Sequence, residues 1–235
     1  MPGMSRLYTI VARYFKIPNA EAEKIIGAGR VLVNGRKVPP SEKLEYWDEV
    51  SCDGKIIRPG VNFTYIKYYK PAGIESTTGQ HIAGNLRSVV SHPAPWQPAG
   101  RLDKESEGLM LLTDDGRIAR AVSDSRTHRE KEYVVTVDRS FDDDFLKQMS
   151  AGVTIMGKKT RPVIIARENE SPDTFRIILT QGLNRQIRRM CYKLGYNVVR
   201  LTRLRIAHIT TAGLHPGEWK ELAEEERDVL LRMIK

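Results

Sequence analysis

One loop of the sequence combines residue types that could do covalent chemistry. Residues 98–108 form a polar stretch that contains Arg101 and Asp103, and the apolar run Leu109-Met110-Leu111-Leu112 follows directly. A cation close to an aspartate keeps its carboxylate ionised, and an ionised carboxylate can act as a nucleophile or as a base at a sugar carbon. Taken alone, such residues more often form a structural salt bridge at the entrance to a buried strand. The pattern therefore identifies Asp103 as a candidate and leaves both interpretations open.

Motifs for other chemistries are missing from the sequence. It contains no GxGxxG or GxxxxGK[ST] phosphate loop and no GxSxG nucleophile turn. None of the five histidines has a Cys, Asp or Glu at a ligand spacing on one element, so we expect no metal site. They are His81, His92, His128, His208 and His215. These absences predict a reaction without a cofactor, or no reaction at all.

The net charge of the chain is concentrated in one segment. Among 235 residues, 38 are basic and 29 are acidic, which gives a net charge of 38 − 29 = +9. Residues 174–217 contain eight basic residues and no acidic one, which leaves the rest of the chain at 30 − 29 = +1. The eight are Arg176, Arg185, Arg188, Arg189, Lys193, Arg200, Arg203 and Arg205. An ordinary solvated surface would explain this cluster, but the lack of acidic residues within it favours a phosphate-binding surface.

Composition excludes several classes of protein. Hydrophobic residues make up 40% and charged residues 29%, so neither a collagen-like nor a wholly disordered chain is expected. No run of 18 apolar residues is present, and the N-terminal residues lack the pattern of a secretory signal. Cys52 and Cys191 form no CxxC pair and no disulfide framework. We therefore expect a cytoplasmic protein without a membrane segment, and we expect it to be a monomer.

Two domains are expected, over residues 1–60 and 61–235. In the first, the spacing of apolar residues predicts two helices, the second capped by Asn19, and Asn34-Gly35 predicts the turn of a hairpin. The predicted helices are 6–14 and 20–28, and the predicted strands are 31–33, 36–38 and 48–52. This pattern indicates a small α+β domain.

Strands outnumber helices after residue 61. Strands are expected at 65–70, 109–113, 131–138, 174–180 and 198–206, and helices at 82–90, 117–122, 141–149, 184–194 and 221–234. Because strands and helices do not alternate strictly, the pattern favours an α+β domain with a largely antiparallel mixed sheet flanked by helices over a doubly wound parallel sheet.

The segment around Asp103 resembles the central motif of the pseudouridine synthases. The shared residues are Gly100-Arg101-Leu102-Asp103, Ser106, Gly108-Leu109 and 111–116. Tyr69-Lys70-Pro71-Ala72-Gly73, Lys131-Glu132-Tyr133 and residues 181–190 resemble further motifs of the family, in the same order. The last of these is most similar to the RluF-like branch of the RsuA/RluB/RluE/RluF group, which modifies ribosomal RNA. The resemblance covers residues 65 to about 219 and implies the pseudouridine synthase fold.

The first domain resembles the alpha-L RNA-binding module of ribosomal proteins. The shared residues are Arg6-Leu7, Ala20-Glu21-Ala22, Ile25-Ile26, 29–35 and Asp48. Two positions where such modules carry basic groups are Pro18-Asn19 and Thr9 here, and residues 1–58 have a net charge of just 10 − 7 = +3. The module is therefore expected to bind RNA weakly, or to bind a partner instead.

Carried over residue by residue, the resemblance assigns roles to individual side chains. The catalytic aspartate falls on Asp103, the active-site tyrosine on Tyr133 and the basic partner of the aspartate on Arg188. Arg101 matches the arginine that holds a flipped-out nucleotide. Further substrate contacts are expected from Lys70, Leu102, Asn184, Arg185, Gln186 and Arg189.

The implied reaction is the isomerisation of a uridine. The bond between uracil and ribose is broken, the base turns, and its carbon 5 is joined to the same sugar carbon, so no cofactor is needed. Whether Asp103 adds to the sugar or removes a proton stays open. A stacked base cannot reach such a pocket, so the uridine must flip out of an unpaired loop or bulge. The expected substrate is ribosomal RNA, with the large-subunit RNA favoured over small-subunit RNA or a transfer RNA hairpin.

Two other functions are compatible with parts of the sequence. A non-catalytic RNA-binding protein would use the first domain and the basic segment, but it has no need of the Asp103 carboxylate beside phosphates, which it would repel. A basic protein that binds other proteins would have no affinity for RNA. Pseudouridine formation is therefore the leading hypothesis, with ribosome biogenesis as its setting.

Overall fold

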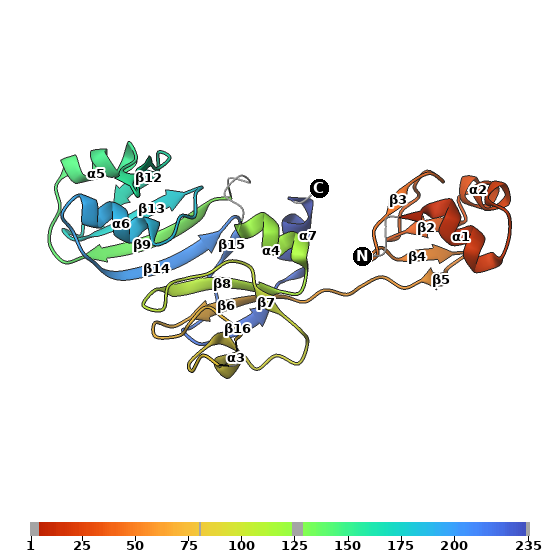
Figure 1. The fold of residues 1–235 in the computed structure, drawn as a ribbon, viewed down its shortest axis with the longest axis horizontal. Helices are drawn as coiled ribbons and strands as arrows, with labels where there is room; N and C mark the ends of the chain where they lie inside the picture. Colours follow the sequence, from red (N-terminus) through yellow and green to blue (C-terminus); the bar gives the residue numbers. More distant parts are fainter. Residues whose placement is uncertain (1–4, 80, 124–128, 234–235) are drawn as a thin grey trace. The chain divides into compact units, whose positions relative to one another are not determined.

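The fold is described from a computed structural model that places residues 5–79, 81–123 and 129–233 (Figure 1). The chain divides into two compact units, Met1–Phe63 and Thr64–Lys235. This boundary lies three residues after the one expected from sequence. His128 and Ile234, which figured in the predicted histidine set and the predicted last helix, lie outside the described residues. No helix in the described ranges is long and apolar enough to cross a membrane.

The first unit packs two helices and a small sheet around one core. Its elements are β1 (Ser5–Arg6), α1 (Leu7–Phe15), α2 (Asn19–Gly27), β2 (Val31–Val33), β3 (Lys43–Leu44), β4 (Val50–Cys52) and β5 (Lys55–Arg58). The strands β2, β4 and β5 form an antiparallel sheet in that order, and β1 pairs with β3. The two helices contribute Leu7, Val11, Ala22 and Ile26 to the buried cluster, at the helical spacing visible in the sequence.

The cap of α2 differs from the prediction. Pro18 is the N-cap residue and Asn19 is already helical, and no side chain caps this end. The carbonyl oxygen of Pro18 accepts hydrogen bonds from the backbone N–H groups of Glu21 and Ala22 at 3.0 and 3.1 Å. The extended backbone of a proline thus starts the helix without help from Asn19.

The predicted hairpin over residues 31–38 forms only its turn. Asn34 and Gly35 have φ angles of 49° and 74°, as a tight turn of the mirror-image type requires. Val33 bridges Arg36, but residues 36–38 form no strand and β2 pairs with β4 instead. Pro39 and Pro40 follow at once, and prolines have no N–H to donate to a sheet ladder.

The second unit is built on a nine-stranded mixed sheet. Its strands are β6 (Tyr65–Lys70), β7 (Gln97–Pro98), β8 (Glu107–Thr113), β9 (Lys131–Val137), β12 (Ile164–Arg167), β13 (Thr174–Leu179), β14 (Val198–Ile206), β15 (Ile209–Thr210) and β16 (Trp219–Glu221). The main path runs β12-β13-β9-β14-β8-β6-β16, with β15 beside β14 and β7 beside β8. The pair of β14 with β8 is parallel and the other pairs of this sheet are antiparallel. The predicted α+β class with a largely antiparallel mixed sheet is confirmed.

Helices flank this sheet. They are α3 (Leu86–Val89), α4 (Gly116–Ser123), α5 (Asp143–Ser150), α6 (Gln186–Lys193) and α7 (Glu224–Arg232), and a separate hairpin consists of β10 (Thr154–Ile155) and β11 (Lys158–Lys159). Figure 1 shows α5 and α6 beside β12 and β13, and α4 close to α7. The short strands β7, β10, β11, β12, β15 and β16 were absent from the prediction because two to four residues carry too little periodicity to detect.

Several predicted helices start too early, for identifiable reasons. The side chain of Asp142 accepts a hydrogen bond from the N–H of Phe145 at 2.9 Å and caps α5, so this helix starts at Asp143. Arg185 has a left-handed backbone with φ 51°, so α6 begins at Gln186 rather than at residue 184. Glu221, the predicted start of the last helix, belongs to β16.

The apolar run in β8 reflects burial on both faces of the strand. Leu109 and Leu111 belong to a cluster with Ile118 of α4, whereas Met110 and Leu112 belong to the larger core on the opposite face. A strand covered on both sides has no polar alternation, which is why this segment reads as a continuous apolar run. The rigid strand begins directly after the loop that carries Asp103.

Candidate active site

The turn after β6 fixes the loop that carries Asp103. The side chain of Lys70 is fully buried, and its ammonium group donates to the carbonyl oxygens of Pro71, Ile74 and Lys104 at 2.9, 2.9 and 3.2 Å. Burial lowers the pKa of Lys70 to about 8. The hydroxyl of Ser76 donates to the carbonyl of Leu102 at 2.6 Å and accepts from its N–H at 3.1 Å. These bonds fix the backbone on both sides of Asp103.

A buried arginine of β14 anchors the same loop from the other side. Arg203 is 3% exposed and donates to the carbonyl oxygens of Leu109 at 2.6 Å and Arg101 at 3.4 Å. β14 approaches Gly108 so closely that a Cβ there would collide with the backbone of Arg203, and Gly108 has a φ of 104°. From the sequence, Arg203 was predicted to belong to a basic surface, and nothing in its motif indicates this positioning role. The parallel β14–β8 pair, at Thr202–Glu107 and Arg203–Gly108, lies at the same point.

Two arginines from the start of α6 face the Asp103 carboxylate. Nε of Arg188 and Nη1 of Arg185 each lie 3.6 Å from Oδ2 of Asp103, whose side chain is 28% exposed. Arg188 is held in place because it donates to the hydroxyl of Ser106 at 3.0 Å and to the carbonyl of Val198 at 3.2 Å. Its Nε is buried and has no hydrogen-bond acceptor among the described residues. The predicted pair of Arg188 with Asp103 is thus brought together as ions, beyond hydrogen-bond distance.

Glu105 is a second carboxylate at this site, which sequence analysis missed. Its Oε1 lies 2.5 Å from Nη1 of Arg185 and 3.7 Å from Nε of Arg188. Burial raises the pKa of Glu105, but its own backbone N–H, the Arg185 side chain and the charge of Arg188 lower it further, so the net shift is downward. An acidic residue two positions after Asp103 in the same loop was the signal available in the sequence.

Tyr133 lies in the core beneath the site. It projects from β9, is 8% exposed, and belongs to the same buried cluster as Leu102 and Ile187 of α6. In the sheet it lies opposite Arg203, which is itself paired with Gly108 at the end of the aspartate loop. Among the described residues no hydrogen bond joins Tyr133 to Asp103, so the structure places the tyrosine near the site without a direct polar contact.

Three of the predicted substrate contacts are buried, which argues against direct contact with RNA. Lys70 and Leu102 are 0% and 8% exposed, and both support the loop as described above. Gln186 is 4% exposed, and its side-chain oxygen accepts a hydrogen bond from the N–H of Leu183 at 3.1 Å. Direct contact of these three residues with RNA stays a prediction, since in the structure they stabilise the backbone of the site.

The other predicted substrate contacts are accessible. Arg101 and Asn184 are exposed, and Arg189 donates to the side-chain oxygen of Asn184 at 3.1 Å. No ion pair involves the side chain of Arg101 or Arg189 in the described parts of the chain. Arg101 and Arg189 thus keep unneutralised donors, whereas Arg185 is paired with Glu105 at 2.5 Å.

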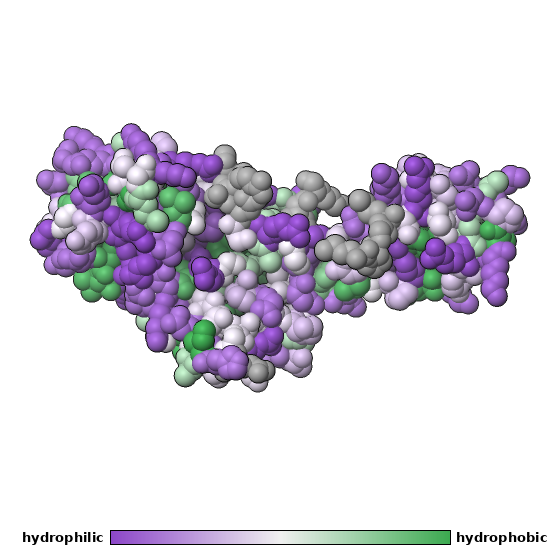
Figure 2. Space-filling model, in the orientation of Figure 1, coloured by the Kyte–Doolittle hydropathy of each residue, from purple (hydrophilic) through white to green (hydrophobic). Residues whose placement is uncertain are grey.

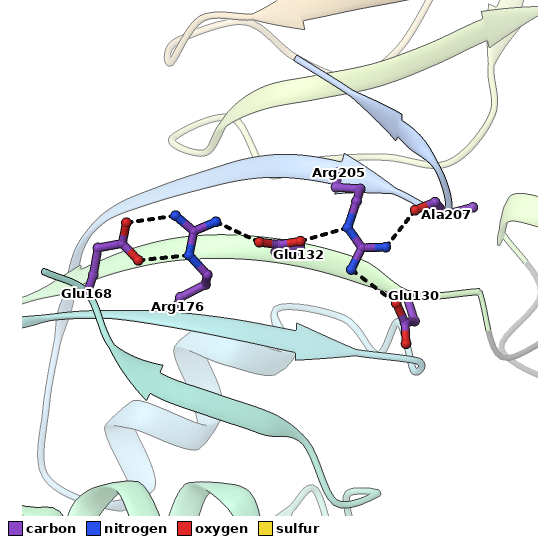
Figure 3. A network of polar contacts seen from close by, with 6 residues as sticks. All are labelled: Glu130, Glu132, Glu168, Arg176, Arg205 and Ala207. Carbon is purple, nitrogen blue, oxygen red and sulfur yellow. Dashed lines mark hydrogen bonds and ion pairs between the residues drawn. The ribbon is translucent and has the colours of Figure 1, made fainter. Parts of the chain in front are cut away.

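The predicted basic surface is smaller than the sequence suggested. Figure 3 shows Arg176 and Arg205 in a row that alternates with Glu168, Glu132 and Glu130 across the sheet. Arg176 donates to Glu168 and Glu132 at 2.6–2.8 Å, and Arg205 donates to Glu132 and Glu130 at 2.7 and 3.0 Å. Since these glutamates lie outside residues 174–217, the interpretation of the whole segment as a phosphate-binding surface is wrong.

The remaining basic residues of the segment gather on α6. Arg200 donates to Glu107 at 2.6 Å and Arg203 is buried, which leaves Arg185, Arg188, Arg189 and Lys193. A groove of about 610 Å³ runs between this helix and the β10–β11 hairpin, and all four line it. The surface around α6 in Figure 2 is mostly hydrophilic, with smaller apolar patches.

Comparison with known proteins identifies the family. A model described as RNA pseudouridylate synthase matches residues 64–193. The chain is 39% identical over 217 residues to the dual-specificity RNA pseudouridine synthase RluF of Escherichia coli (strain K12), covering 92% of this chain and 74% of that protein. The chain belongs to the RNA pseudouridylate synthase family. It is thus an isomerase that acts on RNA.

Other relatives of the synthase match along nearly its whole length. Ribosomal small subunit pseudouridine synthase A of Escherichia coli (strain K12) is 33% identical over 94% of this chain and 97% of its own. A solved structure named as a pseudouridylate synthase has a TM-score of 0.66 and 26% identity, covering 96% of this chain and 99% of that one. An S4 domain model matches residues 5–46, within the first unit of the synthase.

The family match of the synthase contains the site just described. Residues 64–193 include the Asp103 loop, Tyr133 and the four basic residues of α6, but they stop before β14 and Arg203. In the described ranges no group of three or more His, Cys, Asp or Glu could hold a metal ion.

Proposed function

We propose that this synthase converts a uridine of ribosomal RNA to pseudouridine and that the carboxylate of Asp103 performs the reaction. The observation that carries the proposal is the placement of this carboxylate: the Lys70 and Ser76 contacts fix its loop, and two arginines lie 3.6 Å away. Opposite charge at that distance attracts the carboxylate and holds it in one orientation. A carboxylate held in this way can attack a sugar carbon or remove a proton beside it.

The chemistry requires one bond exchange at the sugar. The bond from the sugar carbon to N1 of uracil breaks, the base rotates, and the same carbon forms a bond to C5. C5 loses its proton and N1 gains one, so no atoms are gained or lost overall. Tyr133 is our candidate to pack against the uracil ring and to receive or supply a proton. Because a stacked base cannot reach the loop, the uridine must leave the helix.

Arginines around Asp103 have two proposed roles. Arg188, whose Nε lies 3.6 Å from Asp103 and lacks a hydrogen-bond acceptor among the described residues, is our proposed partner for the aspartate charge as the reaction proceeds. Arg101, Arg185 and Arg189 are accessible and suit the phosphates that flank the flipped nucleotide. Asn184 orients Arg189 through the bond at 3.1 Å. Lys70, Leu102 and Gln186 are buried and stabilise the backbone of the site.

Ribosomal RNA is the substrate we infer. One relative is named as a ribosomal small subunit pseudouridine synthase, and another as a dual-specificity RNA pseudouridine synthase. The motif over residues 181–190 resembles the RluF-like branch, from which we infer large-subunit RNA in particular. We also infer a cytoplasmic location, because ribosomes are assembled there and both cysteines are unpaired.

The proposal is tested by mapping pseudouridine in total RNA from cells that lack the gene. Complementation with the native gene should restore pseudouridine at one or a few sites, and Asp103→Asn should restore none, since an amide is neither nucleophile nor base. Restoration by Asp103→Asn would contradict the assignment. Sites in small-subunit or transfer RNA would replace the inferred substrate, and a map without any change would refute the activity.

A further inference from the structure

The groove beside α6 continues from the candidate active site. Arg185 and Arg188, which face Asp103, also line the groove, and the opposite wall is the β10–β11 hairpin with Met156 and Gly157. Its volume of about 610 Å³ lies within the range of pockets that enclose small organic ligands. An RNA whose uridine enters the site at Asp103 therefore has a neighbouring hollow within reach of its adjacent nucleotides.

The groove has the electrostatic character of a phosphate site. Its lining includes four basic side chains, Arg185, Arg188, Arg189 and Lys193, and no acidic one. Nε of Arg189 is buried without a hydrogen-bond partner among the described residues, while Lys193 is exposed. Lys158 and Lys159, both exposed, belong to the hairpin that forms the opposite wall. A backbone phosphate would supply the acceptors that these donors lack.

Apolar surface in the same groove suits a base. Tyr192 is 75% exposed and Met156 is 68% exposed, so a ring and a thioether face solvent beside the basic residues. Aromatic side chains next to a basic groove are the common arrangement for binding single-stranded nucleic acid, because any base can stack on the ring. An acidic peptide would use the charge but not the flat apolar face.

We propose that this groove binds a nucleotide that flanks the target uridine. Its phosphate contacts Arg189 and Lys193, and its base stacks on Tyr192. The inference rests on the proposed function for the identity of the RNA, and it goes beyond that function because it assigns a second, base-tolerant contact outside the catalytic loop. It extends the required substrate beyond the flipped nucleotide itself.

Direct binding of RNA to the full-length protein tests the groove. The probe is a fluorescent single-stranded RNA of twelve nucleotides with 4-thiouridine at each uridine position. We expect Tyr192→Ala to raise its Kd about 10-fold, and Tyr192→Phe to leave it unchanged because the ring is retained. Ile164→Ala is the matched control, since Ile164 is 65% exposed on β12 and outside the groove. Ultraviolet cross-links should map to Tyr192 or Met156.

A charge reversal tests the phosphate contact separately. Lys193→Glu should raise the Kd and reduce the slope of log Kd against log salt by about one. A Kd for Tyr192→Ala within twofold of the native value would overturn the proposal. So would cross-links that avoid residues 154–157 and 189–193, or a polyglutamate peptide that binds with the same dependence on Tyr192.

The outcome is separable from that of the proposed function. If pseudouridine mapping shows no activity while Tyr192→Ala still weakens RNA binding, the groove stands and the enzymatic proposal fails. If the native protein forms pseudouridine and Tyr192→Ala binds RNA normally, the groove alone is refuted. Tyr192 is so exposed that its replacement is expected to leave folding intact, which circular dichroism would verify.

Discussion

Arg176 and Arg205 on the sheet each bind two glutamates at 2.6–3.0 Å, whereas Arg188 at the start of α6 lies 3.6 Å from Asp103. The sheet network joins two arginines with three glutamates, which gives 2 − 3 = −1, so it offers nothing to a phosphate. At the start of α6, Arg185 and Arg188 face Asp103 and Glu105. Arg189 and Lys193 line the same groove, so the four basic residues and the two carboxylates give 4 − 2 = +2.

The difference separates two uses of arginine in one segment of sequence. On the sheet, the glutamates satisfy the guanidinium groups and tie β9, β13 and β14 together (Figure 3). On α6, Arg189 and Lys193 have no acidic partner in the described parts of the chain, and Arg188 keeps one donor unused. The first set is expected to contribute to stability and the second to catalysis and RNA binding.

The largest predicted effect is on the catalytic rate of Arg188→Ala. Loss of the cation beside Asp103, and of its bond to Ser106, should reduce kcat about 100-fold, the cost of removing one preorganised charge donor. Arg188→Lys should recover part of this rate, because a lysine keeps the charge but not the fork of donors. Arg205→Ala should stay within threefold of the native kcat. Equal losses of kcat in Arg188→Ala and Arg205→Ala would contradict the distinction between the α6 arginines and the sheet arginines.

A smaller effect is expected on the stability of Arg176→Ala. Its charge-assisted hydrogen bonds are partly screened, since the side chain is 39% exposed, so the free energy of unfolding should fall by about 1–2 kcal/mol. Urea denaturation measures this change, with Lys158→Ala as a control that removes an exposed charge. The Kd for RNA should not change. Weaker RNA binding by Arg176→Ala would mean that the sheet arginines contact the substrate after all.

The smallest predicted effect is that Glu105→Gln strengthens RNA binding, whereas the preceding substitutions weaken a property of the protein. Glu105 lies 2.5 Å from Arg185 in the RNA-free protein, so its neutralisation frees that arginine for a phosphate. The Kd for RNA should fall about threefold at low salt, and the gain should shrink as salt screens the exposed pair. Glu130→Gln, in the sheet network, should leave the Kd unchanged. A higher Kd in Glu105→Gln would instead show that Glu105 positions Arg185 for RNA.

Sequence alone predicted the loop that carries Asp103 and the helix that faces it. Asp103 and Arg188 are 85 residues apart, yet each lies in a local motif that could be read on its own, and the structure brings them to 3.6 Å. The strand β8 could be predicted in the same way, because burial on both faces leaves a continuous apolar run. Such patterns involve residues that are consecutive in the chain, so they can be recognised without knowing which distant segments pack against them.

Ion pairs and hydrogen bonds between residues far apart in the chain could not be predicted from the sequence. The glutamate that joins Arg176 and Arg205 is 44 and 73 residues away from them, so their charges seemed free. Lys70 and Gln186 sit in the expected motifs, but polar side chains there turn inward to bond the backbone, which motif position does not reveal. Short edge strands such as β12 and β16 depend on their neighbours rather than on their own periodicity.

The rate of C5 proton loss tests the central claim, that the carboxylate of Asp103 performs the reaction. RNA made with tritium at C5 of uridine releases it to water when pseudouridine forms, so purified variants can be compared in a single assay. Asp144→Asn is the matched control, an identical change at an exposed position of α5. The account predicts native release from Asp144→Asn and none above background from Asp103→Asn, with RNA affinity retained. Release by Asp103→Asn at a rate close to that of the native protein would contradict it.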